Sequence, residues 1–117
     1  MPSTVFPVPD RPHPALLSGL PVLRAMLEEQ RQFRLDQLAE LAAEGEVADR
    51  ARSEVTATLV AGARQALHDI DTALDRMLSG HYGLCTRCHG LISVERLYVL
   101  PQTGFCVDCQ RHLAGPR

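Results

Sequence analysis

The sequence predicts a mainly α protein, in which a long antiparallel two-helix coiled-coil hairpin carries a small four-cysteine finger at one end. The middle of the chain is rich in Ala, Leu, Glu and Arg, with apolar residues at helical spacing. The last third contains all four cysteines, arranged as two Cys-x-x-Cys pairs. With 117 residues, five aromatic side chains and no Trp, the chain suits one small module better than a large globular core.

Residues 1–17 are expected to form a Pro-rich flexible arm. Five prolines lie within the first 14 residues, and proline lacks a backbone N–H and disfavours helix at the residue before it. The segment from Ser18 to Pro21 is typical of a helix start. Ser18 or Gly19 would lie near the N-cap and Pro21 in the first turn.

Residues 18–79 are predicted to form the helical hairpin. Its first helix runs from Val22 to about Glu44 and its second from about Ala48 to Leu78, with Gly45 and Gly80 at their ends. The first has a weak apolar stripe: Leu23, Leu27, Leu38 and Leu41, with Met26 and Phe33 beside it. The second has a cleaner one: Val55, Leu59, Ala63, Ala66/Leu67, Ile70, Ala73/Leu74 and Met77.

Two long helices joined by so short a link must run antiparallel. The second, at about 1.5 Å per residue, would be roughly 45 Å long. The hairpin would therefore place its tip, near residues 44–51, far from the finger. Residues 22–79 contain eleven acids and seven arginines, a balance of −4. Such a surface is either a solvated helix face or complementary to a basic cavity on a partner.

The third predicted region, residues 80–117, is a zinc-finger module built on Cys85, Cys88, Cys106 and Cys109. Seventeen residues separate the inner cysteines, which is the spacing of a four-cysteine zinc site. A closed shell of four thiolates leaves no position for water or substrate, so one structural Zn²⁺ per chain is expected. Two disulfides or a redox Cys-x-x-Cys pair are the alternatives.

Neither a secretory signal nor an apolar run long enough to cross a membrane is visible, which favours a cytoplasmic zinc protein over a disulfide-bonded one. Within the module, residues 91–94 and 97–100 suggest two short strands, although the second run could instead extend a turn. Residues 101–104 are expected to turn the chain back toward the first cysteine pair, and residues 110–114 to form one or two helical turns.

At the tip the sequence reads Glu46-Val47-Ala48-Asp49-Arg50-Ala51. Asp49 alone is explained by N-capping of the second helix, worth about 1 kcal/mol. Tip and finger together resemble the DksA/TraR family of bacterial transcription regulators. The finger does so through residues 80–92, through Arg96-Leu97 and Pro101, and through Cys106-Val107-Asp108-Cys109-Gln110. The likeness extends over about residues 44–111.

That resemblance implies a function. Members of the family bind RNA polymerase and insert the hairpin into its secondary channel, so that acids at the tip lie near the catalytic centre. The family tip reads Asp-x-x-Asp-x-Ala, which Asp49 and Ala51 match, while Glu46 stands at the first Asp position. The expected function is therefore regulation of transcription initiation by a monomer that binds no specific DNA sequence. The need for guanosine tetraphosphate stays open, since only eight residues follow Cys109.

Two other functions remain as alternatives. One is a zinc finger that binds nucleic acid directly, which the acidic hairpin and a pI of about 6.2 disfavour. The other is a helical adaptor. No nucleophile–base pair or open metal site is visible, so an enzyme is not expected. Arg87 and Arg96 are possible polymerase contacts at the channel rim, or else solvated charges or partners of a carboxylate. His89, where the family usually has Gly, is not expected to replace a thiolate.

Overall fold

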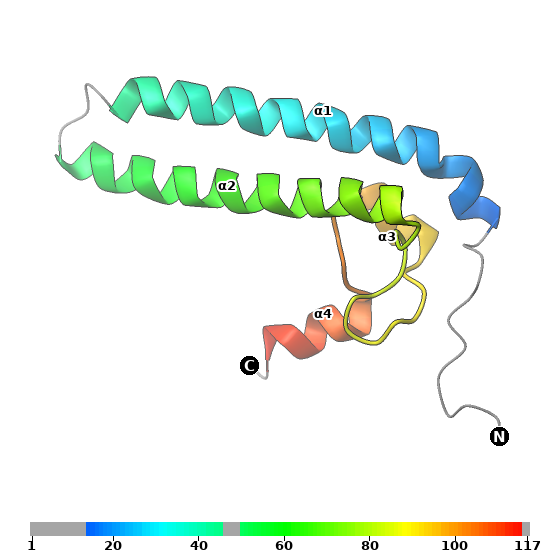
Figure 1. Cartoon of the computed structure of the whole chain (residues 1–117). Coiled ribbons are helices and arrows are strands. Elements are labelled where there is room, and N and C mark those ends of the chain that lie inside the picture. The colour runs from blue at the N-terminus through cyan, green and yellow to red at the C-terminus, as the bar shows by residue number, and fades with distance from the viewer. Residues whose placement is uncertain (1–13, 46–49, 116–117) are drawn as a thin grey trace.

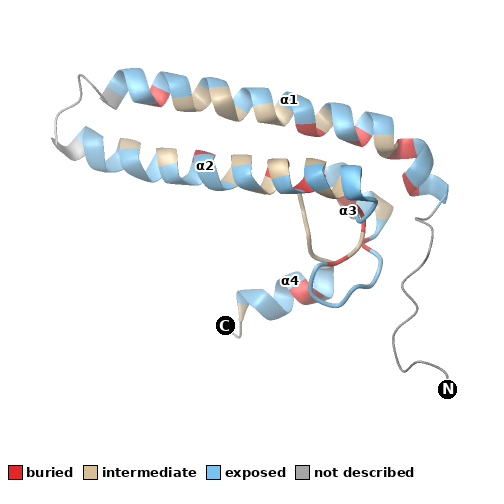
Figure 2. Cartoon of the chain, in the orientation of Figure 1, coloured by how far each residue is buried: buried red, intermediate tan, exposed pale blue. Residues whose placement is uncertain are grey.

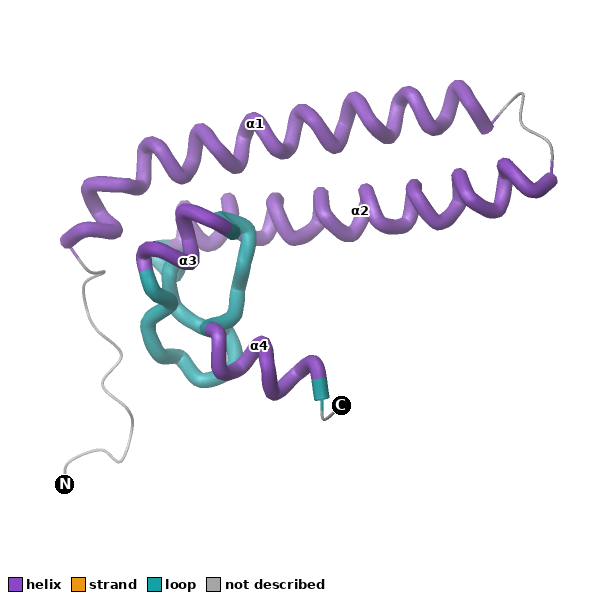
Figure 3. The backbone as a smooth tube through the Cα atoms, turned by 180° about the vertical axis from the view of Figure 1, so that it is seen from behind, coloured by secondary structure: helices purple, strands orange, loops and turns teal. Residues whose placement is uncertain are grey.

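The computed structural model describes residues 14–45 and 50–115, which form a helical hairpin with a small finger packed against one end (Figure 1). The helices are α1 (Pro14–Gly45), α2 (Arg50–Ser79), α3 (Val94–Val99) and α4 (Val107–Ala114). α1 and α2 run antiparallel and side by side, and the finger lies where α1 begins and α2 ends. Seen from behind, the finger covers that same end (Figure 3). The predicted fold class, mainly α with a long hairpin and a four-cysteine finger, is confirmed.

α1 begins earlier than the sequence pattern predicts. It starts at Pro14, a residue suited to a first helical turn, and not near Ser18. Ser18 does not cap the helix, because its hydroxyl donates to the Ala15 carbonyl at 3.1 Å. The extra turn forms because Leu16 is buried in the core at the finger. Pro21 consequently lies inside α1 and cannot complete the backbone ladder, which accounts for the bend at this end of the helix (Figure 1).

The apolar stripe predicted for α2 lies at the helix interface toward the finger, but the prediction is wrong toward the tip. Val55 and Leu59 were expected at the helix interface, but they are 61% and 46% exposed. Two successive steps of four residues rotate a side chain by about 80° around the helix, which carries Val55 out of line with Ala63. The interface instead follows alternating steps of four and three residues through Thr56, Val60, Ala63, Leu67, Ile70, Leu74 and Met77.

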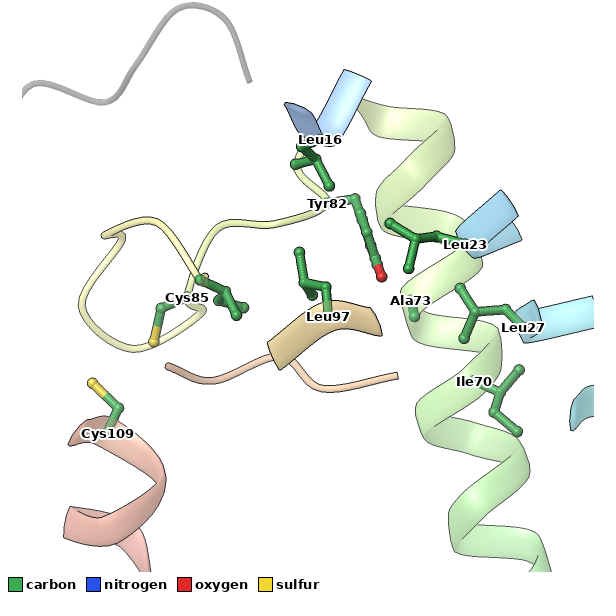
Figure 4. Close-up of a cluster of buried hydrophobic side chains, with 10 residues drawn as sticks. Leu16, Leu23, Leu27, Ile70, Ala73, Tyr82, Cys85, Leu97 and Cys109 are labelled. Atoms are coloured by element: carbon green, nitrogen blue, oxygen red, sulfur yellow. The ribbon is translucent and has the colours of Figure 1, made fainter. Parts of the chain in front are cut away.

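The core lies where hairpin and finger meet (Figure 2; Figure 4). Its buried members come from α1, α2 and the finger: Leu16, Leu23, Leu27, Ile70, Ala73, Tyr82, Cys85, Ile92, Leu97 and Cys109. α2 ends in a Schellman motif that directs the chain into this core. Gly80 has φ +79°, and the N–H groups of Gly80 and His81 donate to the carbonyls of Met77 and Arg76.

The two short strands expected at residues 91–94 and 97–100 do not form. Residues 94–99 are instead the helix α3. Ser93 caps it, since its hydroxyl accepts from the Arg96 N–H at 3.2 Å, and Glu95 lies in the first turn. Leu97 is fully buried on the side that meets the core. Extended pairing within the described residues is limited to one isolated bridge, between Leu84 and Leu91.

Candidate metal centre

The four cysteine sulfurs come together at one point. Cys85, Cys88, Cys106 and Cys109 offer sulfur atoms that all lie within 4.8 Å of one another. Tetrahedral coordination at about 2.3 Å per Zn–S bond requires S···S separations of about 3.8 Å. The Cys88 and Cys106 sulfurs are 3.9 Å apart, which fits that geometry and is far longer than a disulfide bond. The sulfurs of Cys85 and Cys109 also face each other (Figure 4).

The first pair is held in a tight loop after α2. The Cys85 N–H donates to the Gly90 carbonyl at 2.8 Å, and the His89 N–H donates to the Cys85 carbonyl at 2.9 Å. These bonds close the loop, so that both sulfurs turn to the same side. The Gly90 N–H then points at the Cys88 sulfur, 3.4 Å away. An amide directed at sulfur favours the thiolate, which is the form that binds metal.

The second pair is held by the start of α4. Cys106 is the N-cap of this helix, and its sulfur accepts from the Cys109 N–H at 3.4 Å. The positive end of the helix dipole therefore faces Cys106, which favours negative charge on its sulfur. Helical geometry then brings Cys109, three residues further on, to the same side. The first turn of α4 thus positions two ligands at once.

Negative charge on the four neighbouring sulfurs favours the binding of a cation. Burial acts to raise the pKa of Cys85, but the backbone amides of Cys88, Cys106 and Arg87 outweigh it and lower that pKa to about 6. For Cys109, the Arg87 guanidinium acts to lower the pKa. Burial and the three neighbouring sulfurs outweigh this effect and raise it to about 12. Four thiolates this close repel one another, and a divalent cation removes the repulsion. The donor set fits Zn²⁺, and the closed shell makes the ion structural.

Several hydrogen bonds join the segment around the first cysteine pair to the segment that leads to the second pair. The buried Tyr82 hydroxyl donates to the Pro101 carbonyl at 2.8 Å, and burial raises the pKa of Tyr82 to about 12. The Thr86 N–H donates to the Gly104 carbonyl at 2.8 Å, and the Thr86 hydroxyl donates to the same atom. The segment before Cys106 is therefore fixed to the segment around Cys85 even apart from the metal.

Arg76 connects the hairpin to the finger, a role that no motif of the sequence indicates. From the last turn of α2 its guanidinium donates to the carbonyls of His81 and Leu84, just before Cys85. Partial burial lowers the pKa of Arg76, against the opposing effect of the Cys85 and Tyr82 groups. A basic residue in the last helical turn is a visible sequence signal. Its carbonyl partners depend on the tertiary fold and cannot be read from that signal.

The two arginines considered as polymerase contacts have partners inside the finger. Arg87 Nη1 lies 3.6 Å from the Cys109 sulfur. Arg96 Nε donates to the Phe105 carbonyl at 3.0 Å, next to Cys106. Both guanidiniums therefore support the metal centre. Their predicted contact with polymerase stays a prediction. His89 is not among the four clustered ligands, and its φ of +62° is the left-handed conformation that glycine adopts most easily.

The tip residues cannot be placed in the same detail. Glu46 and Asp49 lie outside the described residues, and the side chain of Ala51 does too, so the N-cap expected at Asp49 is not tested. The helices on either side are described. α1 ends at Gly45 and α2 starts at Arg50, at the end of the hairpin away from the finger (Figure 1).

Hairpin and finger together define a class of protein: a helical hairpin that carries a four-cysteine zinc finger at its base. Residues 80–112 match the family model of the prokaryotic dksA/traR C4-type zinc finger. The structure of transcription factor DksA2 from Pseudomonas aeruginosa is similar with a TM-score of 0.69 and 23% identity, over 83% of this chain and 84% of that one. Residues 80–112 are therefore a zinc finger of the dksA/traR type, and the fold of the chain resembles that of DksA2.

A sequence relative adds little about function. An uncharacterized protein of Aquifex aeolicus (strain VF5) is 42% identical over 43 residues, which is 37% of this chain and 30% of that protein. The match thus spans less than a third of the relative's length. In the described part of the chain, no helix has the length and apolarity needed to cross a bilayer.

Proposed function

We propose that this protein binds bacterial RNA polymerase, inserts the far end of its hairpin into the secondary channel and modulates transcription initiation there. The finger would stay at the channel rim. The observation that carries the proposal is the shape of the molecule. A hairpin of 32- and 30-residue helices extends well beyond the core in which the finger is packed. The described residues measure 64 Å in their longest direction and 22 Å in their shortest.

The charge of the hairpin supports the same proposal. Among the exposed charged side chains in the described part of α1 and α2, acids outnumber arginines, and the four residues that link the two helices include Glu46 and Asp49. Carboxylates at the end of a narrow hairpin are able to reach a recessed, metal-dependent catalytic centre and alter its electrostatics. Glu46, Asp49 and Ala51 are proposed as the modulating tip. A role at the polymerase would place the chain in the cytoplasm.

The finger supports a non-catalytic role. Its four sulfurs complete the preferred coordination of zinc, so the ion has no open position at which to activate water or substrate. Arg87 and Arg96 already bind inside the finger. They are proposed as rim contacts only through the parts of their guanidiniums that remain accessible.

The test is Asp49→Asn, because Asn caps a helix about as well as Asp and the change removes only charge. The variant should bind core polymerase with unchanged affinity and lose its effect on the lifetime of promoter complexes. Glu54→Gln is the matched control, since Glu54 is an exposed acid on α2 outside the tip. If Asp49→Asn regulates as well as the unmodified protein, the tip charge has no role.

A second measurement examines the mode of binding. A photo-crosslinker at Ala51 should label the interior of the secondary channel, and one on the finger should label the rim. Labelling of the outer polymerase surface from Ala51, or none, would return the helical-adaptor alternative to first place. A salt-sensitive complex with plain duplex DNA would favour the nucleic-acid alternative instead.

A further inference from the structure

A groove lies between the hairpin and the segment that follows α3. It encloses about 620 Å³, and α1, α2 and the end of α3 all contribute to its walls. Two of its apolar side chains are widely open to solvent: Val99 is 76% exposed and Phe33 is 62% exposed. The apolar part of the lining consists of Met26, Phe33, Ala66, Ile70, Val99 and Leu100.

The polar part of the lining consists mainly of hydrogen-bond acceptors. Glu29 on α1 and Asp69 on α2 supply carboxylates. Gln102 contributes a side-chain oxygen that is buried and accepts no hydrogen bond from the described part of the chain. Arg34 also lines the groove, but it donates to Gln37 at 2.9 Å and lies over the Phe33 ring, 5.4 Å from its centroid. The groove therefore offers negative charge beside an apolar floor.

We propose that this groove is a docking site for a partner segment that presents an apolar side chain next to an arginine or lysine. The apolar side chain would cover Val99 and Leu100, and the cation would lie between the Glu29 and Asp69 carboxylates. Anionic ligands are disfavoured, because two carboxylates repel them.

A hollow on the opposite side of the hairpin differs from this groove in the charge of its lining. A second hollow, of about 510 Å³, is lined by Leu20, Pro21, Arg24, Ala25, Glu28, Leu74, Met77 and Leu78. Its two charged residues, Arg24 and Glu28, pair with each other at 2.9 Å. That hollow has no uncompensated charge in its lining. It provides a matched control, because Leu78 is 77% exposed and thus as open as Val99.

The first experiment uses no polymerase. The zinc-loaded full chain is titrated with N-acetyl-leucyl-arginine amide and, separately, with N-acetyl-leucyl-glutamate amide, and backbone NMR shifts are followed. The arginine probe should shift residues 66–70 and 99–102, and the glutamate probe should not. Glu29→Lys should weaken the arginine probe about fivefold, whereas Asp75→Lys, the same change at an exposed site outside the groove, should have no effect. Equal shifts from both probes, or shifts confined to other residues, overturn the proposal.

The second experiment rests on the proposed function and asks which protein supplies the segment. A photo-crosslinker at position 99 should label core RNA polymerase strongly, and one at position 78 should label it weakly. Glu29→Lys should reduce polymerase binding and Asp75→Lys should not. Strong labelling from position 78 with none from position 99 overturns the proposal while leaving polymerase binding in place. If the unmodified chain binds no polymerase, the proposed function fails, and the peptide titration alone decides the groove.

Discussion

At the end of the hairpin that meets the finger, the side chains of Leu16, Leu23, Leu27 and Ile70 are at most 2% exposed. Toward the tip, the buried side chains in the described part of α1 and α2 are Leu41 and the small Ala63, and the helices there enclose a hollow of about 420 Å³. One pair of helices thus has a tightly packed base and a loosely packed far half (Figure 2).

This difference shows what each half contributes. The base combines apolar burial, the Schellman motif at Gly80 and the hydrogen bonds of Arg76, so it fixes the hairpin rigidly to the metal centre. The far half has few contacts to lose, and such regions open locally at low free-energy cost. Under the proposed function, a far half that enters a partner can tolerate a weak core of its own. Its stability on binding would come from the partner.

The largest expected effect is loss of the metal. Cys85→Ser replaces a buried thiolate ligand by a hydroxyl that binds zinc poorly, so zinc content should fall from one per chain to near zero. Because the binding free energy of such sites, on the order of 10 kcal/mol, is also folding free energy, amide protection across residues 80–112 should be lost. Helicity of α1 and α2 should largely remain. Metal analysis and hydrogen exchange test this, and a variant that retains full zinc would contradict the assigned ligand set.

The second-largest expected effect is the loss of stability when a carboxylate is introduced at the base, compared with the same kind of change in the far half. Ile70→Asp places a carboxylate in the base core, and unfolding free energy should fall by on the order of 4 kcal/mol. Val55→Asp makes the same kind of change on the exposed face of the far half and should alter stability by no more than about 0.5 kcal/mol. Denaturant unfolding followed by far-UV circular dichroism measures both. Similar losses would mean that Val55 lies in the seam after all.

A matched pair of leucines makes the comparison finer. Leu27 is fully buried at the base, and Leu27→Ala should cost about 3 kcal/mol. Leu38 is half-buried beside the hollow in the far half, and Leu38→Ala should cost about 1 kcal/mol because less surface leaves water there. The same unfolding experiment applies. Equal costs would contradict the difference in packing between the halves.

Local signals predicted much of this molecule. Cysteine spacing predicted that the four sulfurs lie together, as they do, and glycine at position 80 predicted the end of α2. The errors arose where tertiary packing decides. Leu16 extends α1 back to Pro14 by packing on the finger, and Leu97 turns a strand-like run into α3 by entering the same core. The seam near Val55 was misjudged because a nearly regular repeat slowly rotates around the helix.

The smallest expected change in stability concerns His89, which directly follows Cys88 and has φ +62°. Relieving a left-handed conformation gains about 1 kcal/mol, but glycine in the unfolded chain has more freedom to lose, which offsets roughly half of that. His89→Gly should therefore raise unfolding free energy by about 0.5 kcal/mol. His89→Ala should lower it slightly, since alanine tolerates this conformation less well than histidine.

The same two variants test whether His89 contributes to metal binding. Its ring nitrogens are not part of the sulfur cluster, so zinc content should stay at one per chain in both. The visible spectrum of the Co²⁺-substituted protein should stay that of four-sulfur coordination, because nitrogen and sulfur ligands split the cobalt d levels differently. A spectral change in both variants would make His89 a ligand. Unchanged spectra with opposite effects of the two variants on stability would show that residue 89 acts only through the backbone conformation. The coordination of the metal would then not depend on the side chain at this position.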